Sequence, residues 1–221
     1  MKYDSIFDVV GHIMVGPSSS HTAGACRIGY IANILLGQIP DKAKISLHGS
    51  FAETYRGHKT DIALIGGLLG FPPEDERIPN SFKIAEKQGM QYSFAETDLG
   101  PDYHPNSVLL ELESKKEKLS IIGSSIGGGN IIIKEINGLE AGFNGDKPTI
   151  IEIHKDIRGM IANITSAVAM HGLHILEMHL SRNIRKGIAL SWIECSASIS
   201  DDLIKTLRDI PEMINVRCLN V

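Results

Sequence analysis

Residues 149–195 read TIIEIHKDIRGMIANITSAVAMHGLHILEMHLSRNIRKGIALSWIEC, and this stretch decides the fold of the second half of the chain. Thr149–His154 is rich in β-branched residues, which favour a strand. Asp156 is expected to cap a helix, and Gly172 suits the left-handed position that follows a helix end. The apolar residues of this predicted helix recur at helical spacing and are Ile157, Ile161, Ile164 and Val168.

The residues after Gly172 predict a hairpin, a second helix and a last strand. Leu176, Met178 and Leu180 alternate with polar residues, so we expect them on one face of a strand. Ser200, followed by two aspartates, is expected to cap a helix that Pro211 ends. The predicted strands are His174–Leu180, Ile188–Cys195 and Met213–Val221. The resulting order, β-α-β-β-α-β, is that of a ferredoxin-like unit.

The first 145 residues mix helices and strands, so the fold class is α+β. A Gly/Asn/Asp/Pro cluster at 142–148 predicts a domain boundary, with domains at 1–145 and 148–221. Ser5–Val10 is a short apolar start. The predicted helices are Thr22–Leu36, Thr60–Leu69 (capped by Thr60 or Asp61) and one within Glu74–Gly89. The predicted strands are Lys44–Leu47, Gln91–Phe94, Ser107–Glu113, Ser120–Ile122 and Ile131–Ile136.

Composition narrows the class of protein. Of 221 residues, 43% are hydrophobic and 22% charged, which is typical of a folded domain. The net charge of −4 argues against nucleic acid or an anionic membrane as partner. The sequence has no long apolar run and does not begin like a signal peptide, so we expect a cytoplasmic protein.

The three cysteines, Cys26, Cys195 and Cys218, are scattered and form no C-x-x-C pair. This argues against a disulfide framework and against a self-contained zinc or iron–sulfur site. We expect all three to be structural.

The strongest local motif is Gly16-Pro-Ser-Ser-Ser-His-Thr22, just before a predicted helix. Its hydroxyls and the free N–H groups of a helix start suit a carboxylate or phosphate. A serine-rich helix cap with a purely local role is the alternative.

A second motif, Gly49–Asp61, follows a strand and precedes a helix, so it is expected at an edge where sites usually lie. His58 in this loop could accept a proton, because imidazole titrates near neutral pH. In the alternative reading His58 is a solvated loop residue.

Two further motifs are a turn at His104-Pro-Asn-Ser107 and the glycine-rich stretch Gly123–Asn130. Successive glycines allow close backbone approach to a ligand and can form an anion nest. The stretch lacks the Gly-Lys-Ser/Thr of a Walker A loop and does not match G-x-G-x-x-G. Taken alone, each motif also fits an ordinary turn or hairpin bend.

Together these motifs resemble the beta chain of two-chain iron–sulfur L-serine dehydratases, across essentially the whole sequence. The segments that carry the resemblance are Gly16–Thr22, Gly57–Asp61, His104–Asn106 and Ser125–Gly129. The N-terminal domain is also similar to the allosteric substrate-binding domain of some phosphoglycerate dehydrogenases, and residues from about Thr149 resemble an ACT domain, a small-ligand-sensing module.

The resemblance implies conversion of L-serine to pyruvate and ammonia, a step of amino-acid degradation and gluconeogenesis, without pyridoxal phosphate. It also implies a [4Fe–4S] cluster held by an alpha partner chain, with the open iron activating the serine hydroxyl. This chain is thereby expected to hold no metal itself, to form a heterodimer and to complete the site at the interface with the alpha chain. The ACT unit is expected to form homodimers or to bind an amino-acid effector.

The resemblance also implies roles for particular residues. His58 is similar to the catalytic base that removes the Cα proton. The residues expected to bind substrate are Ser18, Ser19, Ser20, His21, Thr22, Asn106, Gly127, Gly128 and Gly129.

The chain departs from the family pattern at two places. ACT domains often carry Asp-x-Pro-Gly after their first strand, but Arg158 stands where the proline would be. Lys59 stands where the family often has a small residue after the histidine.

Two other functions compete with this one. The chain could be a non-catalytic, amino-acid-sensing regulatory subunit, but such a chain would not need a titrating base at His58. A hydrolase using Ser20 with His21 or His58 lacks the Gly-x-Ser-x-Gly elbow that would present the nucleophile.

Overall fold

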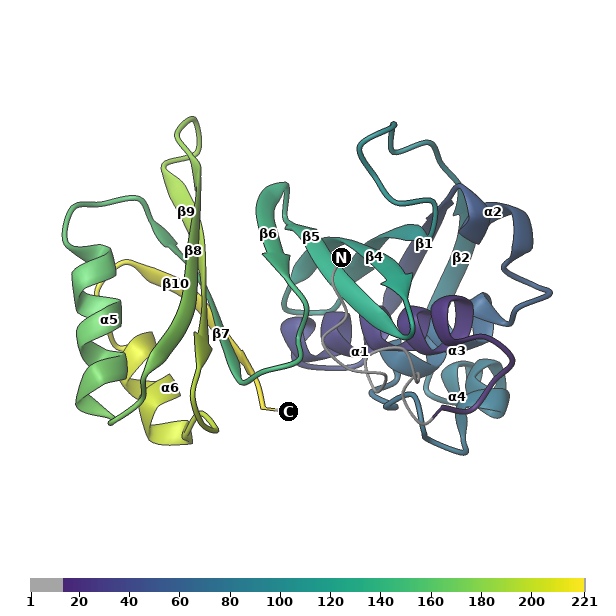
Figure 1. The fold of residues 1–221 in the computed structure, drawn as a ribbon, viewed down its shortest axis with the longest axis horizontal. Helices are drawn as coiled ribbons and strands as arrows, with labels where there is room; N and C mark the ends of the chain where they lie inside the picture. Colours follow the sequence, from purple (N-terminus) through teal and green to yellow (C-terminus); the bar gives the residue numbers. More distant parts are fainter. Residues whose placement is uncertain (1–13, 221) are drawn as a thin grey trace. The chain divides into compact units, whose positions relative to one another are not determined.

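The computed structural model describes residues 14–220, so the predicted start at Ser5–Val10 lies outside the described residues. The chain is an α+β protein of two compact units, residues 1–137 and 138–221 (Figure 1). Across the described range, no helix is both long and apolar enough to span a bilayer.

A mixed sheet has the order β2-β1-β3-β4-β5-β6, and the strands β1 to β5 belong to the first unit. β1 pairs in parallel with β2, whereas the β1–β3, β3–β4 and β4–β5 pairs are antiparallel. The strands are β1 Lys42–His48, β2 Gln91–Glu96, β3 Ser107–Glu113, β4 Lys118–Gly127, β5 Asn130–Ile136 and β6 Leu139–Phe143. The sequence analysis predicted the first five and missed β6, a five-residue strand with one glycine directly before it at 138 and one within it at 142.

Helices lie along one side of this sheet, and α1 packs against β4 and β5 (Figure 1). The helices are α1 Gly24–Leu36, α2 Ser50–Thr54, α3 Thr60–Leu68 and α4 Ser81–Lys87. A π-helical turn, Ser19–Ala23, leads into α1, and a 3₁₀ turn, Ile78–Asn80, leads into α4. Glycines let α1 and α3 touch backbone to backbone: a Cβ on Gly67 would lie 2.1 Å from the Cys26 carbonyl oxygen.

One helix prediction in this unit is confirmed and one needs correction. The helix expected within Glu74–Gly89 is α4, which directly follows the 3₁₀ turn. Neither Thr60 nor Asp61 caps α3. Lys59 is the N-cap residue, in the left-handed region with φ 58°, and makes no side-chain cap.

The second unit is the ferredoxin-like fold that the sequence predicts, with the sheet order β10-β7-β9-β8. Helices α5 and α6 cover one face of this sheet (Figure 1). The elements are β7 Thr149–Lys155, α5 Met160–Met170, β8 Ile175–Asn183, β9 Ile188–Cys195, α6 Asp201–Arg208 and β10 Met213–Leu219. Apolar residues of both helices pack with Ile150, Ile193 and Val216 in one core.

The ends of the helices in this unit confirm two predictions and overturn one. Ser200 Oγ accepts a hydrogen bond from Leu203 N at 3.2 Å, and Gly172 follows α5 with φ 75°. Asp156 does not cap α5, which starts at Met160 after a left-handed Gly159. Asp156 instead accepts a hydrogen bond from Arg182 Nε at 2.8 Å, because the β8–β9 hairpin brings that guanidinium to it.

Two apolar placements in this unit also differ from expectation. Ile157 precedes the helix and is 50% exposed. β8 is an edge strand, so Leu176 and Leu180 of the alternating run are exposed by 54% and 40%. Period-two alternation identified the strand, but it did not identify which of its residues are covered.

Candidate active site

The four sequence motifs meet at one end of the first unit's sheet. Strand register sets this end: His48 at the end of β1 lies opposite Ser107 at the start of β3, and Ser107 lies opposite Ser124 of β4. The π-helical turn before α1 reaches the same end, because the Ser125 hydroxyl of β4 packs against Gly24, where a Cβ would lie 2.1 Å from it.

The Ser18–Thr22 segment is a tightly held turn. Ser18 Oγ accepts from the His21 backbone N–H at 3.2 Å, and Ser18 O accepts from Thr22 N at 2.9 Å. Gly16 is required here, since a Cβ on it would lie 2.3 Å from the Thr22 side chain. π-helical turns of this kind are frequent at functional sites.

His21 is held at both of its ring nitrogens by hydroxyl groups. Nδ1 lies 3.0 Å from Ser20 Oγ, and Nε2 lies 3.1 Å from Ser50 Oγ. Phe51 packs edge-on against the ring, with centroids 5.5 Å apart. Burial, and then the charge of nearby His58, lower the pKa of His21 from 6.5, so this ring is neutral at neutral pH.

His58 lies directly against His21 and is exposed. The two ring centroids are 4.7 Å apart, with an interplanar angle of 38°. The Thr22 hydroxyl donates to the His58 carbonyl oxygen at 2.9 Å, which ties the second motif to the first. An exposed imidazole beside a cluster of hydroxyls is free to accept a proton from a bound molecule.

The His104–Asn106 turn joins the other motifs through its backbone. Asn106 O accepts from Ser125 N at 2.9 Å, and Pro105 O accepts from Phe51 N at 3.3 Å. Asn106 N donates to His104 Nδ1 at 3.1 Å. Burial, and then the charge of Lys134, lower the pKa of His104 from 6.5. Asn106 itself is 9% exposed.

The glycine-rich stretch forms the tight β4–β5 hairpin turn. Gly127, Gly128 and Gly129 all have positive φ angles, of 107°, 62° and 85°, a backbone that favours glycine at each position. Arg27 of α1 donates to the Gly129 carbonyl oxygen at 3.0 Å, so the turn is fixed to the helix that follows the serine-rich segment.

The structure thus places the predicted motifs at one end of the sheet, and it adds two residues that the sequence analysis did not single out. Ser50 contacts His21, and Arg27 holds the glycine turn. Ser50 lies within the Gly49–Asp61 motif, so the sequence gave a signal that it belongs to the site. Arg27 lies in a helix and outside every motif, so the sequence gave no such signal for it.

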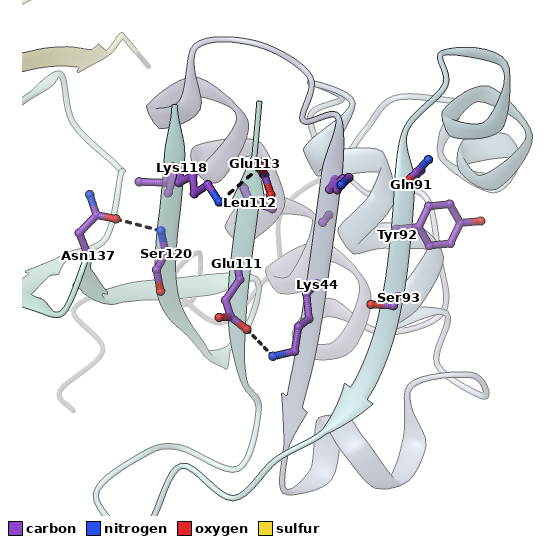
Figure 2. A pocket seen from close by; sticks show the side chains of 13 residues that line it. Lys44, Gln91, Tyr92, Ser93, Glu111, Leu112, Glu113, Lys118, Ser120 and Asn137 are labelled. Atoms are coloured by element: carbon purple, nitrogen blue, oxygen red, sulfur yellow. Dashed lines mark hydrogen bonds and ion pairs between the residues drawn. The ribbon is translucent and has the colours of Figure 1, made fainter. Parts of the chain in front are cut away.

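A cavity lies elsewhere, on the sheet face of the first unit (Figure 2). It has a volume of about 620 Å³ and lies where β1 and β4 begin and β3 ends. Four of its charged side chains form two ion pairs: Lys44 with Glu111 at 2.7 Å and Lys118 with Glu113 at 3.4 Å. It is the opposite end of the strands from the histidines, and we do not assign the site to it.

The residues that the structure describes do not fit a resident metal cluster. Within residues 14–220, no group of three His, Cys, Asp or Glu side chains is placed to hold a metal ion. Cys26 and Cys195 are buried and Cys218 is half-buried, and Cys26 Sγ donates to the Phe71 carbonyl oxygen at 3.3 Å.

The chain is similar in sequence to known serine dehydratase beta chains. The profile of the family described as "Serine dehydratase beta chain" matches residues 5–136. The chain is 43% identical to a "Probable L-serine dehydratase, beta chain" of Bacillus subtilis (strain 168), covering 98% of both sequences. It is 38% identical to the "L-serine dehydratase, beta chain" of Peptoniphilus asaccharolyticus, again over 98% of both.

Among solved structures, the chain is similar to the ACT domain of a GTP pyrophosphokinase from Chlorobium tepidum. The two are 23% identical, with a TM-score of 0.28, and the match covers 33% of this chain and 95% of that domain.

Proposed function

Since the chain belongs to the serine dehydratase beta-chain family, we propose that it is the beta subunit of an iron–sulfur L-serine dehydratase. The reaction removes the Cα proton and the β-hydroxyl of L-serine, and the resulting enamine tautomerises and hydrolyses to pyruvate and ammonia. The observation that carries the proposal is the contact of exposed His58 with the hydroxyl-rich turn through His21 and Thr22.

In this proposal His58 takes the Cα proton. The His58 ring is exposed, and the Thr22 hydroxyl holds the His58 carbonyl oxygen at 2.9 Å. The ring is therefore already positioned to contact a bound substrate. Neutral His21 beside it matters, because a second positive charge 4.7 Å away would oppose proton uptake by His58.

The substrate carboxylate binds at the serine-rich turn. Ser18, Ser19, Ser20, His21 and Thr22 form the turn at the start of α1, where the helix dipole favours an anion, and the serine hydroxyls of this turn can donate to a carboxylate. Asn106 and the Gly127–Gly129 turn lie beside this segment through Ser125 and Arg27 and complete the binding surface.

In this proposal the [4Fe–4S] cluster belongs to an alpha partner chain, as the resemblance to two-chain iron–sulfur L-serine dehydratases implies. We therefore place the complete site at the interface with that chain, in the cytoplasm and without pyridoxal phosphate. This chain supplies the base and the carboxylate-binding turn.

The test is a His58→Ala variant in the complex with its alpha chain, prepared anaerobically and assayed for pyruvate formation from L-serine. We expect kcat to fall by about 10²–10⁴-fold, the usual contribution of a positioned general base. His174→Ala, which changes an exposed histidine of the second unit, serves as the control and should leave kcat unchanged.

Normal turnover by the His58→Ala complex would assign the chemistry to the alpha chain. This chain would then be an amino-acid-sensing subunit, and binding of L-serine to it without catalysis would be its remaining function.

A further inference from the structure

We infer that Ser50 is a positioning residue for this site: its hydroxyl, together with that of Ser20, holds the His21 ring in one orientation and one tautomer against His58. The effect of Ser50 on catalysis rests on the proposed function. The hydrogen bonds from which we infer its positioning role do not depend on that function. They are the 3.1 Å contact of Ser50 Oγ with His21 Nε2 and the 3.0 Å contact of Ser20 Oγ with Nδ1.

Ser50 is itself rigidly placed. Gly49 before it has φ 54° and ψ −126°, and a Cβ there would lie 2.8 Å from the Pro105 carbonyl oxygen. Phe51 after it is fully buried. The Ser50 carbonyl oxygen accepts from Thr54 Oγ1 at 2.7 Å. A hydroxyl on such a backbone has little freedom, so it can fix the ring that it contacts.

The two hydroxyls must act in opposite senses. A neutral imidazole has one N–H donor and one bare nitrogen acceptor, so one of Ser20 and Ser50 donates to the ring and the other accepts from it. Ser20 is in turn 3.4 Å from Ser18 Oγ, which accepts from the His21 backbone N–H. The series of hydrogen bonds Ser18–Ser20–His21–Ser50 therefore has one direction. Without the Ser50 hydroxyl, the His21 ring can flip or change its tautomer.

The consequence for catalysis follows from the ring contact. The His21 and His58 rings are in contact, with centroids 4.7 Å apart and an interplanar angle of 38°, so the orientation of the His21 ring affects the position of the His58 ring. A small misplacement of a reacting group can cost up to about 10²-fold in rate. Ser50 thus acts on the base through His21, and it needs no contact with the substrate.

The first arm of the test uses the full chain alone and reads the ring nitrogens of His21 by ¹⁵N NMR at pH 8, with their signals identified by their loss in His21→Gln. In the native chain we expect one protonated and one bare nitrogen with well-separated shifts. In Ser50→Ala we expect the two shifts to move toward each other as tautomers exchange, and in Ser50→Thr to return. Ser93→Ala, an exposed serine on β2, is the control.

The second arm measures kinetics of the complex with the alpha chain. We expect Ser50→Ala to lower kcat by about tenfold, with KM within about twofold of the native value, and Ser50→Thr to restore most of it. Native ¹⁵N shifts in Ser50→Ala, or equal loss in the alanine and threonine variants, would overturn the inference. A native complex that does not dehydrate L-serine would instead refute the proposed function and leave the NMR result to decide the role of Ser50.

Discussion

Burial favours the neutral form of ionisable side chains in both units, and His21 and Glu152 are one example from each. His21 lies in the candidate site, and Glu152 lies under the helices of the second unit, fully buried. Burial raises the pKa of Glu152 from 4.5 to about 8, although Ser191 Oγ donates to its Oε2 at 2.9 Å. The folded second unit therefore binds a proton at Glu152 that the unfolded chain gives up.

This sets the sign of a pH dependence. A raised carboxyl pKa means that stability is fully present below the unfolded pKa of about 4.5 and is lost as pH rises toward about 8. This loss is a decrease in the free energy of unfolding of up to about 1.4 kcal/mol per pH unit, and we expect Glu152→Gln to remove it. The measurement is urea unfolding at pH 5, 6.5 and 8.5, followed by the fluorescence of Trp192, the chain's single tryptophan. Glu177→Gln, at an exposed position, is the control.

At this scale the sequence predicted identities better than contacts. His58 and the serine-rich turn were assigned from the motifs, and the structure joins them. The roles of Ser50 and Arg27 depend on contacts spanning 29 and 102 positions in the chain. No local pattern encodes such contacts, since they appear only after the sheet has set its register.

At the scale of elements, the α1–α3 contact depends on missing side chains. A Cβ on Gly67 would lie 2.1 Å from Cys26 O and 2.5 Å from Tyr30 N, both backbone atoms that cannot give way. We expect Gly67→Ala to lower the free energy of unfolding of the first unit by about 2 kcal/mol, because overpacking outweighs the gain of about 1 kcal/mol in helix propensity. Far-UV circular dichroism would measure it.

A matched variant separates crowding from a general effect of alanine. At Gly57 the nearest atom to an added Cβ is 3.6 Å away, so Gly57→Ala should leave the unfolding midpoint unchanged. Equal stability of the two variants would mean that α1 and α3 can separate without cost.

The cap of α6 gives a second test at this scale. Ser200 Oγ accepts from Leu203 N at 3.2 Å. Ser200→Ala should destabilise the second unit by about 1 kcal/mol, whereas Ser200→Asp should retain the cap. Trp192 fluorescence during denaturation measures both, and a neutral alanine variant would contradict the role of the cap.

Helix and strand bounds were predicted correctly where one sequence signal was strong. They were predicted wrongly where two sequence signals disagreed or where the element was short. The Ser200 cap and the β3 and β9 bounds were predicted correctly because no other residue type disturbed the pattern. The start of α5 was predicted three residues early: Asp156 suits a cap, but its carboxylate is taken by Arg182 of the neighbouring hairpin. β6 was missed because it is short, with one glycine directly before it and one within it.

At the scale of the whole molecule, each unit has its own core. In residues 138–221 both helices pack on one sheet around Ile150, Ile164, Ile193 and Leu203. We expect a fragment of these residues to unfold in one cooperative transition with Trp192 emission shifting to longer wavelength. A fragment that shows no cooperative transition would show that this core needs the first unit.

The first unit keeps its site and its paired charges at opposite ends of the same strands. β3 starts beside the site at Ser107 and runs for seven residues, about 20 Å, to the β3–β4 turn with its exposed lysines at 115 and 116. A thiol label at Lys115→Cys would react selectively, since burial raises the pKa of Cys26 to about 12 and of Cys195 to about 11 and also raises that of Cys218. The protein can thus be tethered to a sensor surface by this turn, leaving exposed the histidine end, where the proposed function expects a partner chain to bind.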